Sequence, residues 1–143
     1  MSANGLPVFD TTVQHTHLWL NDVSSAIERS DRRQAWYVLS TVLHALRDRL
    51  PMDEVAHLGA QMPMLLRGMY YEGWRPNGAR PAHGTFLSEL EAHFHDEWHD
   101  DPAHYARAVF RVLAIRVTPG ELRDIRSALP EDIRTLWDAA LDN

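Results

Sequence analysis

VLHALRDRLPMDEVAHLGAQMPMLLRGMY, residues 42–70, is the most informative segment of the sequence, because a related pattern recurs 67 residues later as VFRVLAIRVTPGELRDIRSALPEDIRTLW, residues 109–137. The two copies align without an insertion, and Trp19-Leu20 upstream matches Phe86-Leu87 at the same offset. The matched positions hold apolar residues, charged residues and a proline, which fix buried faces and helix ends. The recurrence therefore predicts two copies of one packed helical unit. The matched positions are Val42/Val109, Leu46/Leu113, Arg49/Arg116, Glu54/Glu121, Pro63/Pro130, Arg67/Arg134 and Tyr70/Trp137.

Outward from this stretch, apolar residues repeat with helical spacing, and no segment of useful length alternates with the period of a strand. Ser30 or Asp31, Thr85 and Asp101 stand where helix N-caps are expected, and residues 118–121 have the pattern of a capping box. The sequence therefore predicts an all-α fold of about eight short helices. We expect one domain, residues 1–143, with tandem four-helix repeats at about 16–71 and 85–139 and a linker at about 75–84.

Two further expectations concern the chain end and the core. Residues 1–10 carry no helical stripe, so they should be poorly ordered, and the first helix should be only about three turns long. The longest stripes should supply the centre of the core, which we expect to contain Leu39, Val42, Leu43, Leu46, Val109, Phe110, Val112 and Leu113.

Composition excludes several classes of protein. Cysteine is absent, which removes disulfides and thiolate chemistry and leaves histidine and carboxylates as the strong metal ligands. All 14 basic residues are arginine, and 20 acidic residues give a net charge of -6, which argues against a protein that neutralises nucleic-acid phosphates. The apolar runs are too short to cross a bilayer, and the N-terminus lacks the pattern of a signal peptide. We expect a cytoplasmic protein that binds neither nucleic acid nor membrane.

Several blocks of the sequence resemble one known family. VLHALRDRLPMDEVAHLGAQMPMLLRGMYYEGW at residues 42–74, with His17-Leu18-Trp19-Leu20 upstream, is similar to the DUF2267 family of uncharacterised bacterial proteins. ARAVFRVLAIRVTPGELRDIRSALPEDIRTLW at residues 106–137 is similar to the second half of that family. The resemblance implies an orthogonal all-helical bundle. It implies no activity, cofactor or catalytic residue.

The segment from 89 to 104 departs from the family, because it is rich in histidine and acid. On a helix, His95 and His99 would project from one face, and so would Glu89 and His93, which is the spacing of paired metal ligands. A third and fourth ligand would have to come from elsewhere, and the His-Glu-x-x-His signature is absent. We therefore interpret the segment as a solvated polar face, with a metal site at His95 and His99 as the alternative.

A second candidate site is the aromatic block of Tyr70, Tyr71 and Trp74. Aromatic rings at a helix end can form a docking surface for a partner. However, Tyr70 matches Trp137 in the repeat, which favours a role in the core for at least that ring.

Four arginines occupy matched positions in the repeat, and we expect them to pair with the matched acids Glu54 and Glu121 at neighbouring helix starts. Such ion pairs would tie helix ends together without any phosphate ligand. The arginines are Arg49, Arg116, Arg67 and Arg134.

The sequence contains neither a glycine-rich phosphate loop nor a Gly-x-Ser-x-Gly elbow, so it predicts no catalytic residue and no cofactor. The interpretation that follows is a non-catalytic protein-interaction or scaffold module, whose partner is another protein or a second copy of the chain. The alternative is a helical bundle that binds a metal or small ligand through its histidine-rich fifth helix.

Overall fold

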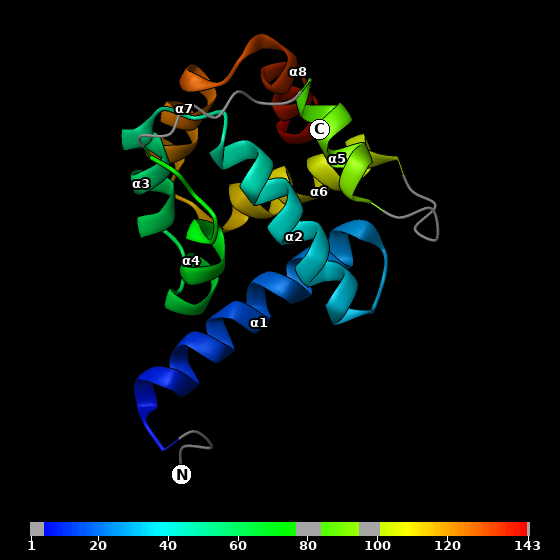
Figure 1. The fold of residues 1–143 in the computed structure, drawn as a ribbon. Coiled ribbons are helices and arrows are strands. Elements are labelled where there is room, and N and C mark those ends of the chain that lie inside the picture. The colour runs from blue at the N-terminus through cyan, green and yellow to red at the C-terminus, as the bar shows by residue number, and fades with distance from the viewer. Residues whose placement is uncertain (1–4, 77–83, 95–100, 143) are drawn as a thin grey trace.

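The computed structural model describes residues 5–76, 84–94 and 101–142 (Figure 1). Within these ranges the chain forms helices and no strand, which confirms the predicted all-α class. The described residues form eight helices, which are α1 (Pro7–Ile27), α2 (Arg32–Arg47), α3 (Met52–Ala60), α4 (Met64–Tyr71), α5 (Phe86–His93), α6 (Pro102–Arg116), α7 (Pro119–Ala128) and α8 (Glu131–Leu141).

Helices α2 and α6 form the centre of the bundle and contact each other. Helix α1 packs against both, α8 covers α6, and α4 and α5 pack on α2. Helices α3 and α7 lie against each other at the edge of the molecule (Figure 1). Every residue predicted for the centre of the core is at most 1% exposed, because the stripes of α2 and α6 face inward.

Side chains predicted to cap helices do so. Asp31 accepts a hydrogen bond from the N–H of Arg33 at 2.9 Å, and Thr85 accepts one from the N–H of Ser88 at 3.1 Å. The carboxylate of Asp101 caps α6 in the same way. Each of these bonds satisfies an N–H that has no partner within its helix.

Helix α4 begins after Pro63, whose side chain cannot cap it. The hydroxyl of Thr12 on α1 accepts the N–H of Leu65 at 2.8 Å and so satisfies one of the free N–H groups of that first turn. The start of α4 is thereby tied to α1.

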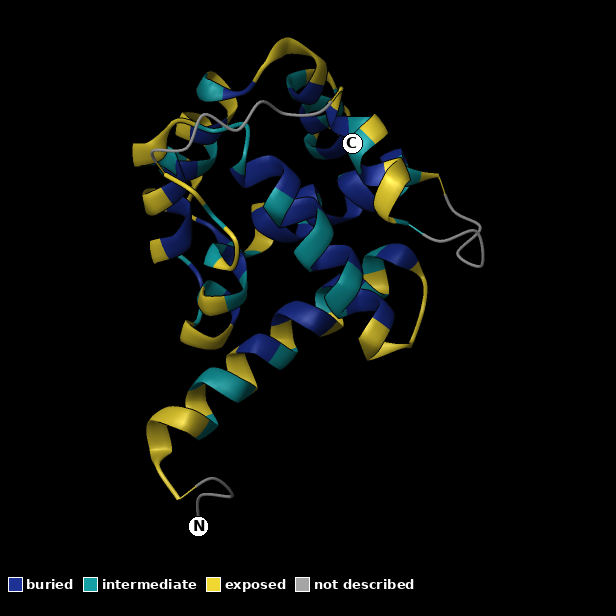
Figure 2. Cartoon of the chain, viewed as in Figure 1, coloured by how far each residue is buried: buried dark blue, intermediate teal, exposed yellow. Residues whose placement is uncertain are grey.

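The N-terminal helix is longer than the sequence suggests. Helix α1 begins at Pro7 and has 21 residues, so the expectation of poor order is wrong for Pro7 to Asp10, while residues 1–4 lie outside the described ranges. A proline in the first turn loses no hydrogen bond, and an acid such as Asp10 interacts favourably with a helix N-terminus. The first half of α1 projects from the bundle and is mostly exposed (Figure 2).

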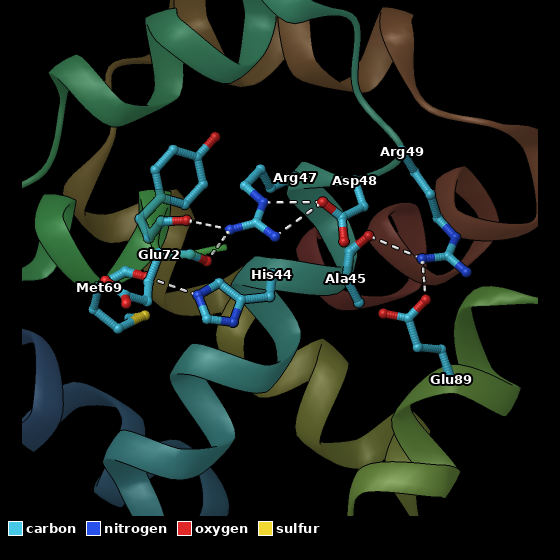
Figure 3. Close-up of polar contacts among 9 residues, drawn as sticks. His44, Ala45, Arg47, Asp48, Arg49, Met69, Glu72 and Glu89 are labelled. Atoms are coloured by element: carbon cyan, nitrogen blue, oxygen red, sulfur yellow. Dashed lines mark hydrogen bonds and ion pairs between the residues drawn. The ribbon is translucent and has the colours of Figure 1, made fainter. Parts of the chain in front are cut away.

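Two side chains of α2 satisfy the C-terminal carbonyl groups of α4 (Figure 3). His44 Nε2 lies 2.7 Å from the carbonyl oxygen of Met69. Arg47 donates through Nη1 to the carbonyl oxygens of Tyr70 and Glu72 at 2.7 and 2.8 Å. These carbonyls lie at a helix end, where intrahelical donors run out. The buried Arg47 therefore holds α4 onto the core.

No helix in the described part of the chain combines the length and the apolar composition needed to cross a bilayer.

Candidate metal centre

The first turns of α3 and α7 bring Glu54 and Glu121 together. Glu121 is 8% exposed and the side chain of Glu54 is 14% exposed. Within the described ranges, the Oε2 atoms of both residues are buried, and no N–H or hydroxyl group donates to either of them. In this part of the chain, the two carboxyl groups can hydrogen-bond only to each other, when one of them is protonated. Buried carboxylates are ordinarily paired with a cation or satisfied by donors. This pair therefore marks a position where an additional positive group would be favourable.

The local structure at the start of α7 frees the Glu121 side chain for this contact. The hydroxyl of Thr118 accepts the N–H of Glu121 at 3.4 Å, as the capping-box pattern predicts. The second bond of a capping box would run from the N–H of Thr118 to the carboxylate of Glu121. Here the N–H of Thr118 donates instead to Oε1 of Gln61 at 3.3 Å. Gln61 thus replaces the Glu121 carboxylate in the cap.

The electrostatics of the pair follow from burial and like charge. Burial, followed by the negative charge of Glu54, raises the pKa of Glu121 to about 7. The charge of Asp124 and a side-chain hydrogen bond with Glu54 act in the same direction, while His57 opposes the shift. Loss of solvation and a nearby like charge both disfavour the ionised form of a carboxyl group. Perturbed carboxyl groups of this kind concentrate at functional sites.

The expected ion pairs between the matched arginines and these acids are wrong. Arg49 Nη1 binds Glu89 at 3.0 Å, and Arg116 Nε binds Asp22 at 2.6 Å. Asp22 lies on α1, which packs against the helix of Arg116, and Glu89 lies on α5, which packs against α2, the helix that ends two residues before Arg49.

The other two matched arginines bind helix ends instead of acids. Arg67 and Arg134 each donate to two backbone carbonyl groups at the end of a preceding helix. The acceptors are Gly59 and Met62 for Arg67, and Arg126 and Leu129 for Arg134. In the described residues, no arginine therefore forms an ion pair with Glu54 or Glu121.

A third potential ligand completes the cluster. His57 lies one turn after Glu54 on α3, with Nδ1 3.7 Å from Oε1 of Glu54. One ligand atom from each of Glu54, His57 and Glu121 lies within 4.8 Å of the other two. Two carboxylates and an imidazole are a donor set that divalent transition metals accept. The residues present therefore fit a metal ion.

A sequence signal for this cluster exists, although it was not used to predict a site. Glu54-x-x-His57 places a carboxylate and an imidazole on one helix face, and Glu121-x-x-Asp124 occupies the equivalent positions 67 residues later. Glu-x-x-His pairs contribute ligands in carboxylate metal sites of helical bundles. What the sequence could not provide was the contact between α3 and α7.

The aromatic candidates lie side by side, but one of them is in the core. Tyr70 is fully buried and donates its hydroxyl to the carbonyl of Val55 at 2.9 Å. The ring centroid of Tyr71 is 5.0 Å from that of Tyr70 and 5.4 Å from that of Trp74. The hydroxyl of Tyr71 lies against Gly59, where a Cβ atom would collide with it. Packing therefore explains the position of Tyr70 in the core and the close approach of Tyr71 to Gly59.

The histidine-rich candidate site falls largely outside the described residues, which exclude both His95 and His99. Glu89 and His93, the second pair expected on one face of this helix, form other contacts. Glu89 binds Arg49, and Nδ1 of His93 lies 2.8 Å from the carbonyl oxygen of Glu89.

Fold and site together define an all-helical bundle with a buried carboxylate pair where two short helices meet. A family model described as "Uncharacterized conserved protein (DUF2267)" matches residues 16–136, and the chain belongs to this family, as the resemblance implied. The comparison with curated proteins found no match. Because family membership assigns no activity, function has to be argued from the site.

Proposed function

We propose that this protein binds one divalent cation at the contact between α3 and α7, through Glu54, His57 and Glu121. The observation that carries the proposal is the buried Oε2 of Glu121, to which no N–H or hydroxyl group of the described residues donates. It belongs to a residue that is only 8% exposed and lies beside a second acid. A cation there would replace the lost hydration of both carboxylates and cancel their repulsion.

The position of the site supports a role in holding the two halves of the chain together. We infer that residues 16–71 and 85–139 are structural repeats. The contacts Arg49–Glu89 and Arg116–Asp22 are exchanged between the halves at the 67-residue offset, which supports this inference. On this view each repeat supplies one glutamate, and the ion joins them. A crystal structure of the protein tests the repeat, because the two segments should superimpose with the same helix order.

Equilibrium dialysis of chelator-treated protein against Zn²⁺, Mn²⁺, Mg²⁺ and Ca²⁺ at neutral pH tests the proposed function. We expect one ion per chain for at least one of these metals. The Glu54→Gln and Glu121→Gln variants keep the shape of each side chain and remove its charge, so they should weaken binding at least about tenfold.

A matched control separates this site from the histidine-rich segment. The His95→Ala, His99→Ala double variant should retain the bound ion. If it loses the ion while the glutamine variants keep it, the site belongs to residues 89–104. If none of the four ions binds in a one-to-one ratio, the proposed function is wrong.

A second candidate function is self-association through α1, which would make the chain a protein-interaction module. Leu6, Val8 and Phe9 are each about half exposed at or beside the start of the projecting half of this helix (Figure 2). Residues 5–18 contain a single acid, Asp10, in a chain of net charge -6, so two copies could meet there with little repulsion. We infer that the occupant of this surface is a second copy.

Sedimentation equilibrium tests this second candidate. A dimer of the natural protein should dissociate in the Phe9→Glu variant, because a charge would replace an apolar contact. Ile115→Glu is the control, since Ile115 is 67% exposed on α6, outside the projecting segment. A natural protein that stays monomeric at all concentrations would exclude the second copy as the partner.

A further inference from the structure

The donor set of the α3–α7 site contains one nitrogen ligand, and this determines the class of ion. His57 contributes the imidazole, from the same helix face as Glu54. Mg²⁺ and Ca²⁺ bind through oxygen atoms, whereas imidazole favours zinc, nickel, copper and iron. We propose, on the basis of the function proposed above, that the site selects a first-row transition metal of the zinc class over Mg²⁺ and Ca²⁺.

The charge of the cluster agrees with a divalent ion. Glu54 and Glu121 together supply two negative charges, and neutral His57 adds none, so a divalent ion would balance the three ligands. Asp124 lies one turn after Glu121 on α7, and its negative charge also acts on Glu121. An exposed acid at this position would favour the approach of a cation without being needed as a ligand.

The exposure of the ligands indicates a site that exchanges its ion. Glu121 is buried, whereas the side chain of His57 is 58% exposed. Three protein ligands from two helices leave at least one coordination position for water, as in zinc sites that are not closed. We therefore expect reversible binding, in contrast to the closed four-ligand shell of a structural zinc site.

Competition titrations with two His57 variants test the selectivity. In the natural protein, an excess of Mg²⁺ or Ca²⁺ should not displace Zn²⁺. His57→Ala should lower Zn²⁺ affinity at least about tenfold, because a direct ligand is lost. His57→Asp makes the three ligands all oxygen and should reduce the preference for Zn²⁺ over Ca²⁺. Both variants should fold normally, since the side chain is mainly exposed.

His15→Ala is the control for non-specific imidazole binding, since His15 is exposed on α1 and should have no effect. Addition of Zn²⁺ should also shift the imidazole NMR signals of His57 and leave those of His15 unchanged. Equal affinity for Ca²⁺ and Zn²⁺, with His57→Ala unchanged and Glu121→Gln impaired, would overturn the selectivity and leave the proposed function standing. Absence of binding by every ion would overturn both.

Discussion

One carboxyl oxygen of Glu54 and one of Glu121 lie within 4.8 Å of each other at the contact between α3 and α7, and each residue has one buried oxygen to which no N–H or hydroxyl group of the described residues donates. Above the raised pKa of Glu121, a buried charge and a part-buried like charge lie side by side, and this reduces the stability of the folded chain. Carboxyl groups with strongly perturbed pKa values cluster at functional sites. The pair is therefore easier to explain as a binding site than as part of the scaffold.

The first prediction follows from that repulsion. In chelator-treated protein at pH 8, Glu121→Gln should raise the free energy of unfolding by roughly 1 kcal/mol, because the amide removes a buried charge and can donate to Glu54. Glu131→Gln is the matched control, since Glu131 is an exposed glutamate in the first turn of α8. Urea denaturation measures both variants, and a Glu121 variant less stable than the control would contradict the prediction.

The second prediction concerns Arg47, whose side chain is 4% exposed and is balanced by Asp48 at 3.0 Å. Arg47→Lys should lower the free energy of unfolding by about 2–4 kcal/mol, because an ammonium group cannot reproduce the planar fork that reaches the carbonyl groups of α4. Arg126→Lys, on the exposed pair with Asp138, should have a much smaller effect. Similar losses at the two sites would show that Arg47 is not a support for α4.

The third prediction is a pH dependence that arises at His44. Burial lowers the pKa of His44 below its ordinary 6.5, and the charges of Arg47 and His93 act in the same direction. The hydrogen bond to Met69 and the charge of Glu72 act in the opposite direction. The unfolded chain therefore takes up a proton near pH 6.5 that the folded chain does not, and stability falls as pH decreases through this range.

Comparison with a His44→Gln variant isolates this contribution. Between pH 7.5 and about 5.5, the variant should lose less stability than the natural protein. The slopes of unfolding free energy against pH should differ by an amount that corresponds to the uptake of up to one proton. Parallel curves for the two proteins would show that His44 is not the titrating group.

The fourth prediction concerns the core. Leu46 and Leu113 occupy matched positions on α2 and α6 and are fully buried. Truncation of either to alanine should cost about 2–5 kcal/mol, because the surrounding helices cannot close the cavity. Chemical denaturation checks this, and losses below about 1 kcal/mol at both positions would place α2 and α6 at the periphery.

Sequence patterns predicted the helices because the helical spacing of apolar residues and the capping residues are local features of the sequence. The stripe of Leu39, Val42 and Leu46 determined α2, and Asp31 marked its start. The extent of α1 was missed because its first half, from Pro7, buries little apolar surface and so leaves no stripe.

The candidate site was harder to predict, because it depends on a contact between distant segments. The matched positions of Glu54 and Glu121 were evident, but their most natural partners in the sequence were arginines. Those arginines instead reach Glu89, Asp22 and backbone carbonyl groups, which only the packing of the helices determines.

Anomalous X-ray diffraction from crystals of the natural protein grown with Zn²⁺ can locate the ion itself. We expect a peak at the zinc edge between Glu54, His57 and Glu121, at ligand distances of about 2.0–2.2 Å, and its disappearance in Glu121→Gln. Crystals with the two carboxyl groups in direct contact and no peak between them would contradict this expectation, since a shared proton would then explain the pair.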